Sequence, residues 1–494
     1  MKRSPDGLAP IVTLDRRLAK PLHRQLYDGL RDAILEGRLR PGQRLPATRT
    51  LARDLRVSRL PVVAAFEQLV DEGYVISRVG AGTFVSSAFP GHRGSRIGVG
   101  SSPAADASTT PRSHRRRLPR SPLATLDEPW LERWGPFRVG QPTVDAVDAR
   151  AWGRLVAWHA RRMPERLHAY GDPMGYRPLR EALAHYLGTA RSVRCDAEQI
   201  MITSGSQQGL TVTAHALLEP GDEVWCEEPG YRGARDALLL RGARPVPVPV
   251  ADDGLDVTAG IARHPQARAA YITPSHQYPL GVVMSAPCRL RLLDWARRRG
   301  AWVIEDDYDS EYRYDAQPIA ALQALDADQR VVYVGTLSKV LFPALRLGYL
   351  VIPRDLVARF RRVRDAVDIF PPPLHQAALH DFIRNGHLTR HIRRMTAVYA
   401  ERRRALVEAI RRELGESVRI VGDRAGLHLT LMLPPGADDR DVAVRAAGRG
   451  VSVTPLSSCY AGRRRQPGLV LGYAAAPREE IAAAVRELGS VIGA

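Results

Sequence analysis

Between residues 199 and 352 the sequence alternates short apolar runs with longer amphipathic stretches, and no other feature constrains the fold as strongly. The stretch 286–299, which lies between two of the runs, has the periodicity of a helix that packs on an apolar layer. Strands that alternate with helices form a mostly parallel or mixed sheet covered by helices on both faces, so we predict an α/β fold. The predicted strands span 199–203, 223–226, 269–273, 301–305, 331–334 and 347–352.

Length and composition limit the classes of protein that fit. A chain of 494 residues is long enough for two to four domains. No stretch of roughly 18 apolar residues predicts a membrane span, and the N-terminus lacks the apolar core of a signal peptide. The four cysteines are scattered without a Cys-x-x-Cys pair, which favours reduced packing residues over disulfides or a metal site. We therefore expect a cytoplasmic protein without a metal.

The positive charge of the chain is uneven. The net charge is +19, and residues 1–120 hold 22 Lys and Arg against 10 Asp and Glu. An N-terminal quarter this basic indicates a polyanionic partner.

The first 86 residues predict a small helical domain. An amphipathic helix spans 21–37, and two short helices follow at 49–55 and 60–72, with Ser58 as a plausible N-cap in the turn between them. Two short helices joined by a tight turn have helix-turn-helix geometry. Two strand-like runs, 73–77 and 83–86, flank a glycine-rich turn and predict a wing.

Four motifs in this region resemble the winged helix-turn-helix of GntR-type bacterial regulators: Pro-Gly-Gln-Arg-Leu-Pro-Ala-Thr-Arg-Thr-Leu-Ala (41–52), Val-Ser-Arg (57–59), Glu-Gln-Leu-Val-Asp-Glu-Gly-Tyr (67–74) and Gly-Ala-Gly-Thr-Phe-Val (80–85). The resemblance implies a double-stranded DNA operator as partner. It places the DNA contacts at Arg49, Arg53, Ser58, Arg59 and the wing near Gly82.

An arginine at the start of a recognition helix, such as Arg59, can reach a guanine edge bidentately, whereas Arg49 and Arg53 can hold phosphates. Such proteins often carry Thr or Asn after Ser-Arg, where this chain has Leu60 and Pro61, so the operator sequence stays open. The alternative is a winged helix that contacts only protein.

Residues 87–127 are rich in Gly, Ser, Pro, Ala and Arg and show little apolar periodicity. This composition predicts a flexible linker. We therefore predict a DNA-binding domain at 1–86, a linker at 87–127 and an effector domain at 128–494.

Lys339 is unusual in a chain that uses arginine for most of its positive charge. The only other lysines are Lys2 and Lys20, both near the N-terminus. Arginine cannot replace lysine where the chemistry needs a deprotonatable amine, such as a Schiff base with a carbonyl. Lys339 follows the apolar run 331–334 and lies among small hydroxyl residues, Thr336 and Ser338. A catalytic type of lysine fits this setting better than the alternative, a surface lysine.

Other polar motifs also follow predicted strands. Ser204-Gly-Ser-Gln-Gln-Gly209 begins a helix and suits a phosphate, although an ordinary helix start can look the same. Glu305-Asp-Asp-Tyr-Asp309 can contact a ring through its carboxylates and its phenol. The alternative is that its acidic residues lie in a loop and bind a cation or nothing. Glu228-Pro-Gly-Tyr231 offers an aromatic side chain for stacking.

Together with Ala-Tyr-Gly-Asp-Pro-Met-Gly-Tyr (169–176), the order of these motifs resembles the fold-type I aminotransferases over roughly residues 165–475. The resemblance implies a large domain with a mixed, mostly parallel sheet, a smaller C-terminal subdomain, pyridoxal 5′-phosphate as cofactor, and a homodimer. It implies a Schiff base with the cofactor at Lys339, and a bond from Asp306, or less favourably Asp307, to the pyridine nitrogen. The remaining implied cofactor contacts are Tyr308 to the ring oxygen, Tyr231 stacked on the ring, Gly205, Ser206, Gln207, Thr336, Ser338 and Arg346 around the phosphate, and Tyr170 to the neighbouring subunit's phosphate.

Two departures from the aminotransferase pattern weaken a prediction of vigorous transamination. Where aminotransferases show Asn-Pro-x-Gly, this chain has Pro-Ser-His-Gln-Tyr-Pro-Leu-Gly (274–281), so His276 or Gln277 takes the place of the asparagine. The late run 468–473 also lacks the arginine that binds a substrate carboxylate, which leaves Arg232 and the triplet 463–465 as candidates.

A winged helix linked to an aminotransferase-like body resembles the MocR/GabR-type transcription regulators. We predict a PLP-dependent DNA-binding regulator that senses PLP or an amino compound through an aldimine at Lys339. One alternative is a PLP-dependent aminotransferase with an accessory DNA-binding domain, and weak or residual transaminase activity fits either hypothesis. A further alternative is a repressor with a cofactor-free body.

Overall fold

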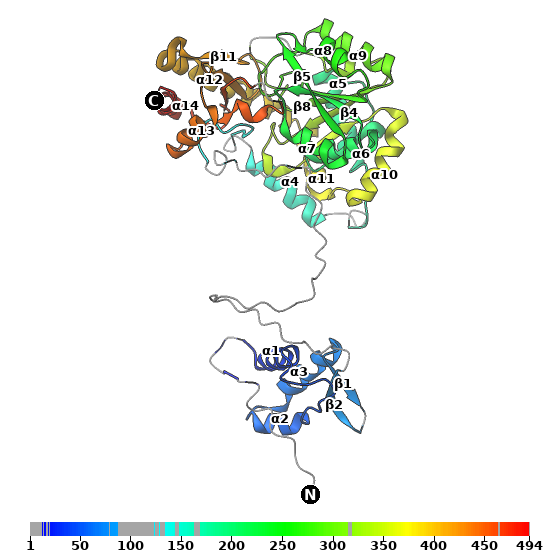
Figure 1. Cartoon of the computed structure of the whole chain (residues 1–494). Coiled ribbons are helices and arrows are strands. Elements are labelled where there is room, and N and C mark those ends of the chain that lie inside the picture. The colour runs from blue at the N-terminus through cyan, green and yellow to red at the C-terminus, as the bar shows by residue number, and fades with distance from the viewer. Residues whose placement is uncertain are drawn as a thin grey trace, which may run out of the picture. The chain divides into compact units, whose positions relative to one another are not determined.

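The computed structural model describes residues 12, 14–15, 18, 20–78, 80–86, 123, 128, 134–143, 148–162, 168–314, 319–462 and 465–493. The chain divides into two compact units, Met1–Arg116 and Arg117–Ala494 (Figure 1). The predicted linker lies outside the described residues, apart from Leu123, so its boundaries stay a prediction.

The N-terminal unit has the predicted helix-turn-helix and wing. Helix α1 (Leu22–Leu35) packs against α3 (Arg59–Asp71), and α2 (Thr48–Asp54) precedes α3 across a short turn. Strands β1 (Val75–Arg78) and β2 (Gly82–Val85) pair in antiparallel register to form the wing. Because successive turns of α1 and α3 bury the apolar residues of one face in one cluster, this unit has a core of its own.

The larger unit contains an eight-stranded sheet in the order β3-β10-β9-β8-β7-β4-β5-β6. Strands β10 and β6 are antiparallel to their neighbours and the other pairings are parallel, which confirms the predicted mixed, mostly parallel α/β sheet. The strands are β3 (Ile200–Thr203), β4 (Glu223–Glu228), β5 (Arg244–Ala251), β6 (Gly254–Leu255), β7 (Ala269–Ile272), β8 (Trp302–Asp307), β9 (Val331–Thr336) and β10 (Gly348–Val351).

Helices cover both faces of this sheet (Figure 1). Alternate residues of one strand point to opposite faces, so Tyr271 and its neighbour Ala270 pack into two different apolar clusters, one beneath each layer of helices. The helices of the large domain are α4 (Ala149–Arg162), α5 (Arg177–Arg191), α6 (Ser206–Leu217), α7 (Arg232–Arg241), α8 (Val257–Arg263), α9 (Ala286–Arg299), α10 (Val357–Asp368) and α11 (Pro373–Arg384).

Strand β8 is longer than the sequence predicts. The predicted run ends at residue 305, whereas the strand continues through Asp306 and Asp307, both paired with β9. The alternation of a strand therefore sends these two neighbouring carboxylates to opposite faces of the sheet.

Helix α12 (His387–Leu414) leads into a smaller C-terminal subdomain, as predicted. Its antiparallel sheet has the order β11-β12-β14-β13, and α12, α13 (Asp439–Gly448) and α14 (Arg478–Ile492) share its apolar core. The strands are β11 (Arg419–Val421), β12 (His428–Met432), β13 (Thr454–Pro455) and β14 (Gly468–Gly472). Over the described part of the chain, no helix has the length and apolar character that crossing a bilayer requires.

Candidate functional site

A cavity of about 380 Å³ lies where the large domain meets the C-terminal subdomain. It lies at the carboxyl ends of β7, β8 and β9 and at the beginnings of α6 and α7, where pockets form in open α/β sheets. The structure brings together in its wall six residues that the sequence predicts as cofactor contacts: Ser206, Tyr231, Asp306, Tyr308, Thr336 and Lys339.

Lys339 is partly buried in this wall. Its Nζ donates a hydrogen bond to the backbone carbonyl of Gly140, at 2.7 Å. Burial lowers the pKa of the Lys339 amine, which the nearby Asp309 and Asp306 carboxylates partly oppose. Burial therefore brings the amine closer to its neutral, nucleophilic form, as Schiff-base chemistry requires.

Asp306 presents an unpaired oxygen beside this amine. Its Oδ2 accepts a hydrogen bond from the Tyr271 hydroxyl at 2.8 Å, but its buried Oδ1 has no partner among the described residues. Burial raises the pKa of the Asp306 carboxyl to about 7. A buried carboxylate oxygen without a partner is costly, so a ligand with a cationic ring N–H fits this position.

Asp307 has a different environment on the opposite face of the sheet. Its Oδ2 accepts hydrogen bonds from Arg191 Nε at 2.9 Å and from the Tyr333 hydroxyl at 2.6 Å. Asp307 is absent from the cavity wall. The geometry therefore favours Asp306 over Asp307 as the partner of a ring nitrogen.

Four tyrosines line the cavity: Tyr231, Tyr271, Tyr278 and Tyr308. The Tyr308 hydroxyl donates to the backbone carbonyl of His276 at 2.8 Å. Tyr231 precedes the first turn of α7, and burial raises the pKa of its phenol to about 12. Both rings that the sequence predicts as cofactor contacts therefore border the same cavity.

The beginning of α6 forms a cradle suited to a phosphate. Gly205 is the N-cap residue of α6, with a φ of +84° that a glycine adopts without strain. A Cβ at Gly205 would lie 2.8 Å from Nη2 of Arg346, so this side chain lies directly against the helix start. The α6 N-terminus and the Arg346 guanidinium together favour an anion.

The other predicted phosphate contacts lie around this cradle with different side-chain roles. Thr336 is in the cavity wall, and the Ser338 hydroxyl is buried without a hydrogen-bond partner among the described residues. The Gln207 amide instead donates to the carbonyl of Gly233 at 2.7 Å. Gln207 therefore offers its backbone to this position while its side chain ties α6 to α7.

The predicted place of His276 and Gln277 beside the ring stays a prediction. Neither residue is in the cavity wall. The Gln277 amide donates to the carbonyl of Pro229 at 2.9 Å, and His276 Nδ1 lies 3.2 Å from Asp309 Oδ2. Both side chains hold loops together, and Tyr278 is the residue of this motif that reaches the cavity.

His428, the first residue of β12, also lines the cavity, although no feature of the sequence predicted it. Its Nε2 lies 3.2 Å from the carbonyl of Pro279, and burial lowers the pKa of its imidazole well below the usual range. A neutral histidine therefore borders the cavity. No local pattern marks it, because the C-terminal subdomain brings it there from far along the chain.

His276, Asp309 and His428 place three potential ligand atoms within 4.8 Å of one another. The contact of His276 with Asp309 and that of His428 with Pro279 already occupy ring nitrogens of both histidines. These contacts, with the hydrogen bond from the Tyr308 hydroxyl to the carbonyl of His276, tie together the loops that carry Tyr278 and Tyr308.

The candidates for a carboxylate contact have different environments. Arg232 lines the cavity, but its guanidinium lies 3.1 Å from Glu128 and 3.4 Å from Asp236. Arg465 is exposed and donates to the carbonyl of Gly462 at 3.4 Å. Positions 463 and 464 lie outside the described residues.

Tyr170 lies outside the cavity wall of its own chain. Its side chain is 82% exposed and its ring contacts Phe370 edge-on, with 6.0 Å between the centroids. An aromatic residue this exposed is available to a second subunit. Its predicted contact with the neighbouring subunit's phosphate stays a prediction.

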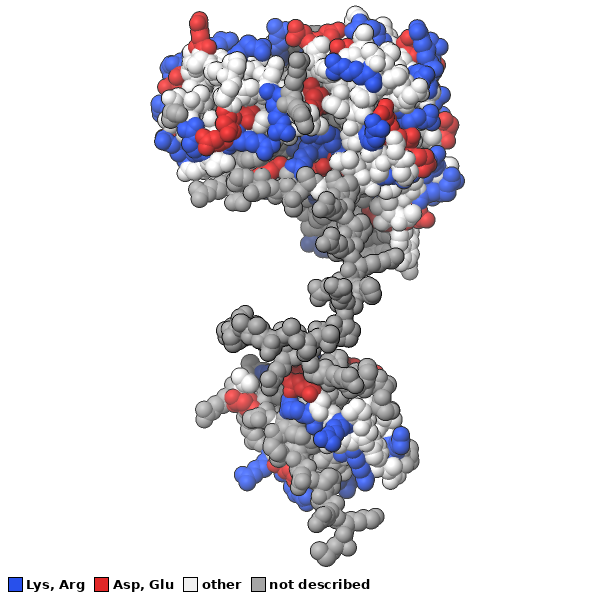
Figure 2. All heavy atoms as spheres, viewed as in Figure 1, with Lys and Arg blue, Asp and Glu red and all other residues white. Residues whose placement is uncertain are grey.

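The predicted DNA contacts lie on the exposed side of the helix-turn-helix. Arg49, Arg53, Ser58 and Arg59 are all exposed. Arg59 is the first residue of α3, and its Nε donates to the Thr48 hydroxyl at 3.3 Å, which joins the starts of α2 and α3. Figure 2 shows several Lys and Arg side chains on the viewed face of this unit.

At the wing, Gly82 has a φ of +111°. A Cβ there would lie 2.9 Å from Nε of Arg44, so the Arg44 side chain packs against the wing turn. The sequence analysis did not single out Arg44, because it lies in a turn far from the wing along the chain.

Two family models match the chain. The model described as aminotransferase class I and II matches residues 139–488, and the model of the bacterial regulatory proteins of the gntR family matches residues 22–85. The first covers more than half of the sequence and the second covers the winged helix-turn-helix.

Curated relatives share both parts or only the larger one. The probable rhizopine catabolism regulatory protein MocR of Rhizobium meliloti is 40% identical over 464 residues, which cover 94% of this chain and 92% of that protein. The 2-aminoadipate transaminase of Thermus thermophilus is 31% identical over 361 residues, which cover 72% of this chain and 89% of that enzyme.

Solved structures resemble the larger unit. The α-aminoadipate aminotransferase of Thermus thermophilus, solved with N-(5′-phosphopyridoxyl)-L-leucine, matches with a TM-score of 0.67 and 30% identity, over 72% of this chain and 92% of that one. The kynurenine aminotransferase of Pyrococcus horikoshii, solved with PMP, matches with a TM-score of 0.69 and 27% identity, over 74% and 92%.

Both structures hold forms of the cofactor that the cavity fits, so the domain family is PLP-dependent. The order of the two domains matches that of the full-length relative from Rhizobium meliloti. The chain therefore belongs to the MocR-type transcription regulators, in which a GntR-type winged helix-turn-helix precedes an aminotransferase class I and II domain.

Proposed function

We propose that the protein is a PLP-dependent regulator that binds an operator in double-stranded DNA and senses PLP or an amino compound at Lys339. The observation that carries this proposal is the unpaired Oδ1 of Asp306 in the same cavity as the partly buried Lys339 amine. This pair fits an aromatic ring with a cationic nitrogen and a carbonyl, both of which PLP supplies.

Different side chains around the cavity would hold different parts of the cofactor. Asp306 would hold the ring nitrogen, and Tyr231 would stack on the ring. Arg346 and the start of α6 would hold the phosphate, because both favour negative charge. PLP supplies an electrophilic carbon to the Lys339 amine.

Sensing by an amino compound follows from the chemistry of this amine. PLP bound here would supply an electrophilic carbon, and an incoming primary amine would compete with the Lys339 amine for it. Nothing is oxidised or reduced. Because such a competition would release the Lys339 side chain from the cofactor, it changes the contacts in the cavity and can bias the domain between two arrangements.

Substitution of Lys339 tests this proposal. We expect Lys339→Ala to abolish covalent attachment of PLP, seen as loss of the visible absorbance of the bound cofactor. Borohydride reduction and peptide mapping should locate a pyridoxyl group on Lys339 in the parent protein. Lys339→Arg is the matched control, since it keeps the positive charge but lacks a deprotonatable amine. A pyridoxyl group on no residue, or on a residue other than Lys339, would refute the proposal.

The second candidate function is a PLP-dependent aminotransferase with an accessory DNA-binding domain. The 31% identity to a transaminase of Thermus thermophilus favours it. Enzymes commonly turn over at about 1–10³ s⁻¹, and a regulator with residual activity should be far slower. Assays with amino acids and 2-oxo acids therefore separate the two functions.

We also propose a homodimer located in the cytoplasm. The exposed Tyr170 supports the dimer, because its predicted contact with a phosphate requires a second subunit. The similarity to a MocR regulator supports the location, because a DNA operator in a bacterium lies in the cytoplasm.

A further inference from the structure

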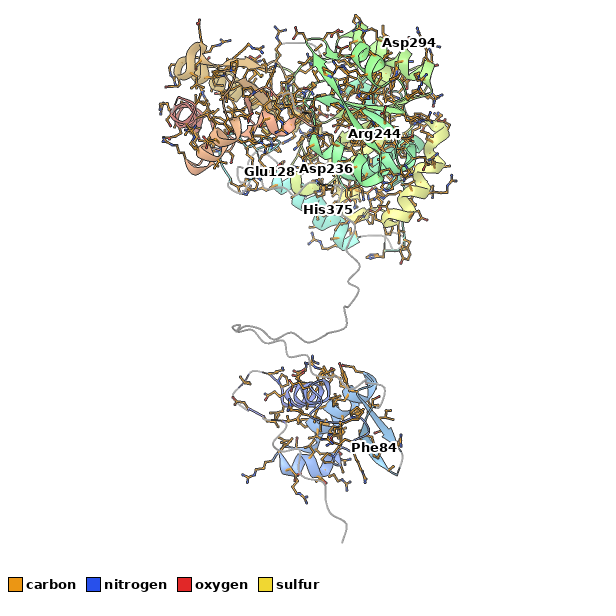
Figure 3. The ribbon with its side chains drawn as sticks, in the orientation of Figure 1. Phe84, Glu128, Asp236, Arg244, Asp294 and His375 are labelled. Carbon is orange, nitrogen blue, oxygen red and sulfur yellow. The ribbon has the colours of Figure 1, made fainter. Side chains whose placement is uncertain are left out.

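One part of the cavity wall is built around Arg232, the first residue of α7. Its Nη1 lies 3.1 Å from Oε1 of Glu128 and its Nε lies 3.4 Å from Oδ2 of Asp236. All three residues line the cavity, and Figure 3 labels Glu128 and Asp236 at the junction of the two lobes of the larger unit. The Arg232 guanidinium thus forms ion pairs with both the Glu128 and the Asp236 carboxylates.

This arrangement sets the sign of charge that a ligand meets. Within the described wall, the Lys and Arg side chains are Lys339 and Arg232, and Lys339 is engaged by the cofactor in the proposed function. Glu128 and Asp236 together exceed the charge of Arg232 by one negative unit. A ligand carboxylate would therefore meet like charge at close range, which raises its free energy in a partly desolvated cavity.

The neighbouring wall adds groups that form hydrogen bonds without positive charge. Thr454, Ser458 and Tyr278 contribute hydroxyls. The segment that carries Ser458 is held to the larger domain, because Glu228 accepts hydrogen bonds from the amides of Ala461 and Gly462 at 3.0 and 2.6 Å. The wall is thus fixed before a ligand enters, and an ordered polar wall discriminates between ligands.

We propose that the effector is a primary amine without a carboxylate, whose other polar groups are hydrogen-bond donors. Glu128 and Asp236 accept these donors, either hydroxyl or ammonium groups, while the primary amine meets the cofactor at Lys339. This inference rests on the proposed function and narrows its effector to amino alcohols and polyamines, in contrast to amino acids.

Two matched pairs of probes test this inference in the full-length, PLP-loaded protein. Serinol differs from L-serine, and putrescine from γ-aminobutyrate, in that a donor group replaces the carboxylate. The visible spectrum of the bound cofactor reports each titration. We expect serinol and putrescine to change the spectrum at concentrations at least about tenfold lower than their carboxylate counterparts, which corresponds to about 1.4 kcal/mol.

The double variant Glu128→Gln with Asp236→Asn supplies a second readout. It removes both negative charges and leaves the Arg232 guanidinium without its two carboxylate partners, so the preference should reverse toward L-serine and γ-aminobutyrate. Glu219→Gln is the matched control, because Glu219 pairs with Arg241 at 2.9 Å on α7 but is absent from the wall. The control should keep the preference of the parent protein.

The outcomes separate this inference from the proposed function. A protein without cofactor absorbance would contradict the proposed function itself. Normal absorbance with tighter binding of the carboxylate probes, or with no response to any of the four, would overturn only the effector class. A preference for serinol and putrescine that persists in the double variant would remove Glu128 and Asp236 as its cause and overturn the inference.

Discussion

Asp306 and Asp307 are neighbours in the sequence, but their carboxylates lie on opposite faces of the sheet and have different partners. Each carboxylate keeps one oxygen without a hydrogen-bond partner among the described residues. Asp307 is paired with the Arg191 guanidinium on one face of the sheet, whereas Asp306 accepts only from the neutral Tyr271 hydroxyl and faces the cavity. Burial without a cationic partner raises the pKa of Asp306 to about 7. In the cofactor-free protein this carboxyl is therefore a cost to stability at neutral and higher pH.

The sign of this effect gives a prediction. A carboxyl whose pKa is higher in the folded than in the unfolded protein stabilises the fold at pH values below its unfolded pKa, about 4. This contribution to stability is lost as the pH rises toward the folded pKa. We expect cofactor-free Asp306→Asn to lose less stability than the parent between about pH 4 and pH 8, with a difference of about 1–4 kcal/mol. Denaturant unfolding at several pH values measures it.

Asp294→Asn is the control for this prediction. Asp294 is half-exposed on α9, labelled in Figure 3, and its hydrogen bond from Arg297 lowers the pKa of its carboxyl. Its contribution therefore has the opposite sign and is screened by solvent. Identical pH profiles for Asp306→Asn and the parent protein would show that Asp306 is not a strained carboxyl.

At the scale of elements, strand β5 shows where a local pattern misleads. Its sequence, Arg-Pro-Val-Pro-Val-Pro-Val-Ala, places proline at every second position, and the sequence analysis assigned no strand there. The amide of Arg244 donates to the carbonyl of Asp222, which precedes β4. Every second residue after Arg244 therefore directs its amide toward β4. The prolines, which lack an amide hydrogen, therefore fall on the other side, where the short β6 pairs only with the end of β5.

Helices α2 and α3 carry the prediction for DNA binding. We expect Arg59→Ala to weaken operator binding by about 1–3 kcal/mol, because an arginine at the start of a recognition helix can bond a guanine edge bidentately. Arg53→Ala should lower affinity for operator and unrelated DNA alike and reduce the salt dependence, since a phosphate contact carries no sequence information. Fluorescence anisotropy at several salt concentrations measures both effects.

Arg244→Ala serves as the control for DNA binding. Arg244 lies in the larger unit, where it pairs with Glu223 at 2.8 Å. The Arg244→Ala substitution should leave operator affinity unchanged. An Arg59→Ala variant with the affinity of the parent protein would remove Arg59 from the DNA interface.

At the scale of the whole molecule, the proposed homodimer makes a prediction about shared sites. If Tyr170 completes the site of the partner subunit, a heterodimer of Tyr170→Ala and Lys339→Ala chains has one site with both defects and one intact site. We expect co-expressed, doubly tagged heterodimers to regain about half of the cofactor absorbance of the parent protein, although neither variant alone binds the cofactor normally.

The two homodimeric variants, purified in parallel, are the controls. If Tyr170 acts within its own chain, both sites of the heterodimer carry a defect and no normal site reappears. A monomeric protein at micromolar concentration by light scattering would exclude the arrangement altogether.

The sequence by itself determined the two kinds of domain, the mixed α/β sheet and the lysine. Hydrophobic periodicity and turn residues act over a few neighbours along the chain, so short motifs such as Thr-Leu-Ser-Lys339 and Val-Ser-Arg59 carry these features locally. Only the tertiary structure decided which polar groups share the cavity. Gly140, Glu128 and His428 come to Lys339 from distant segments, because the C-terminal subdomain and the segment before α4 pack over the strand ends. The packing of distant segments also brought Glu128 to Arg232, whereas the pairing of Arg232 with Asp236 follows from the i, i+4 spacing of one helix.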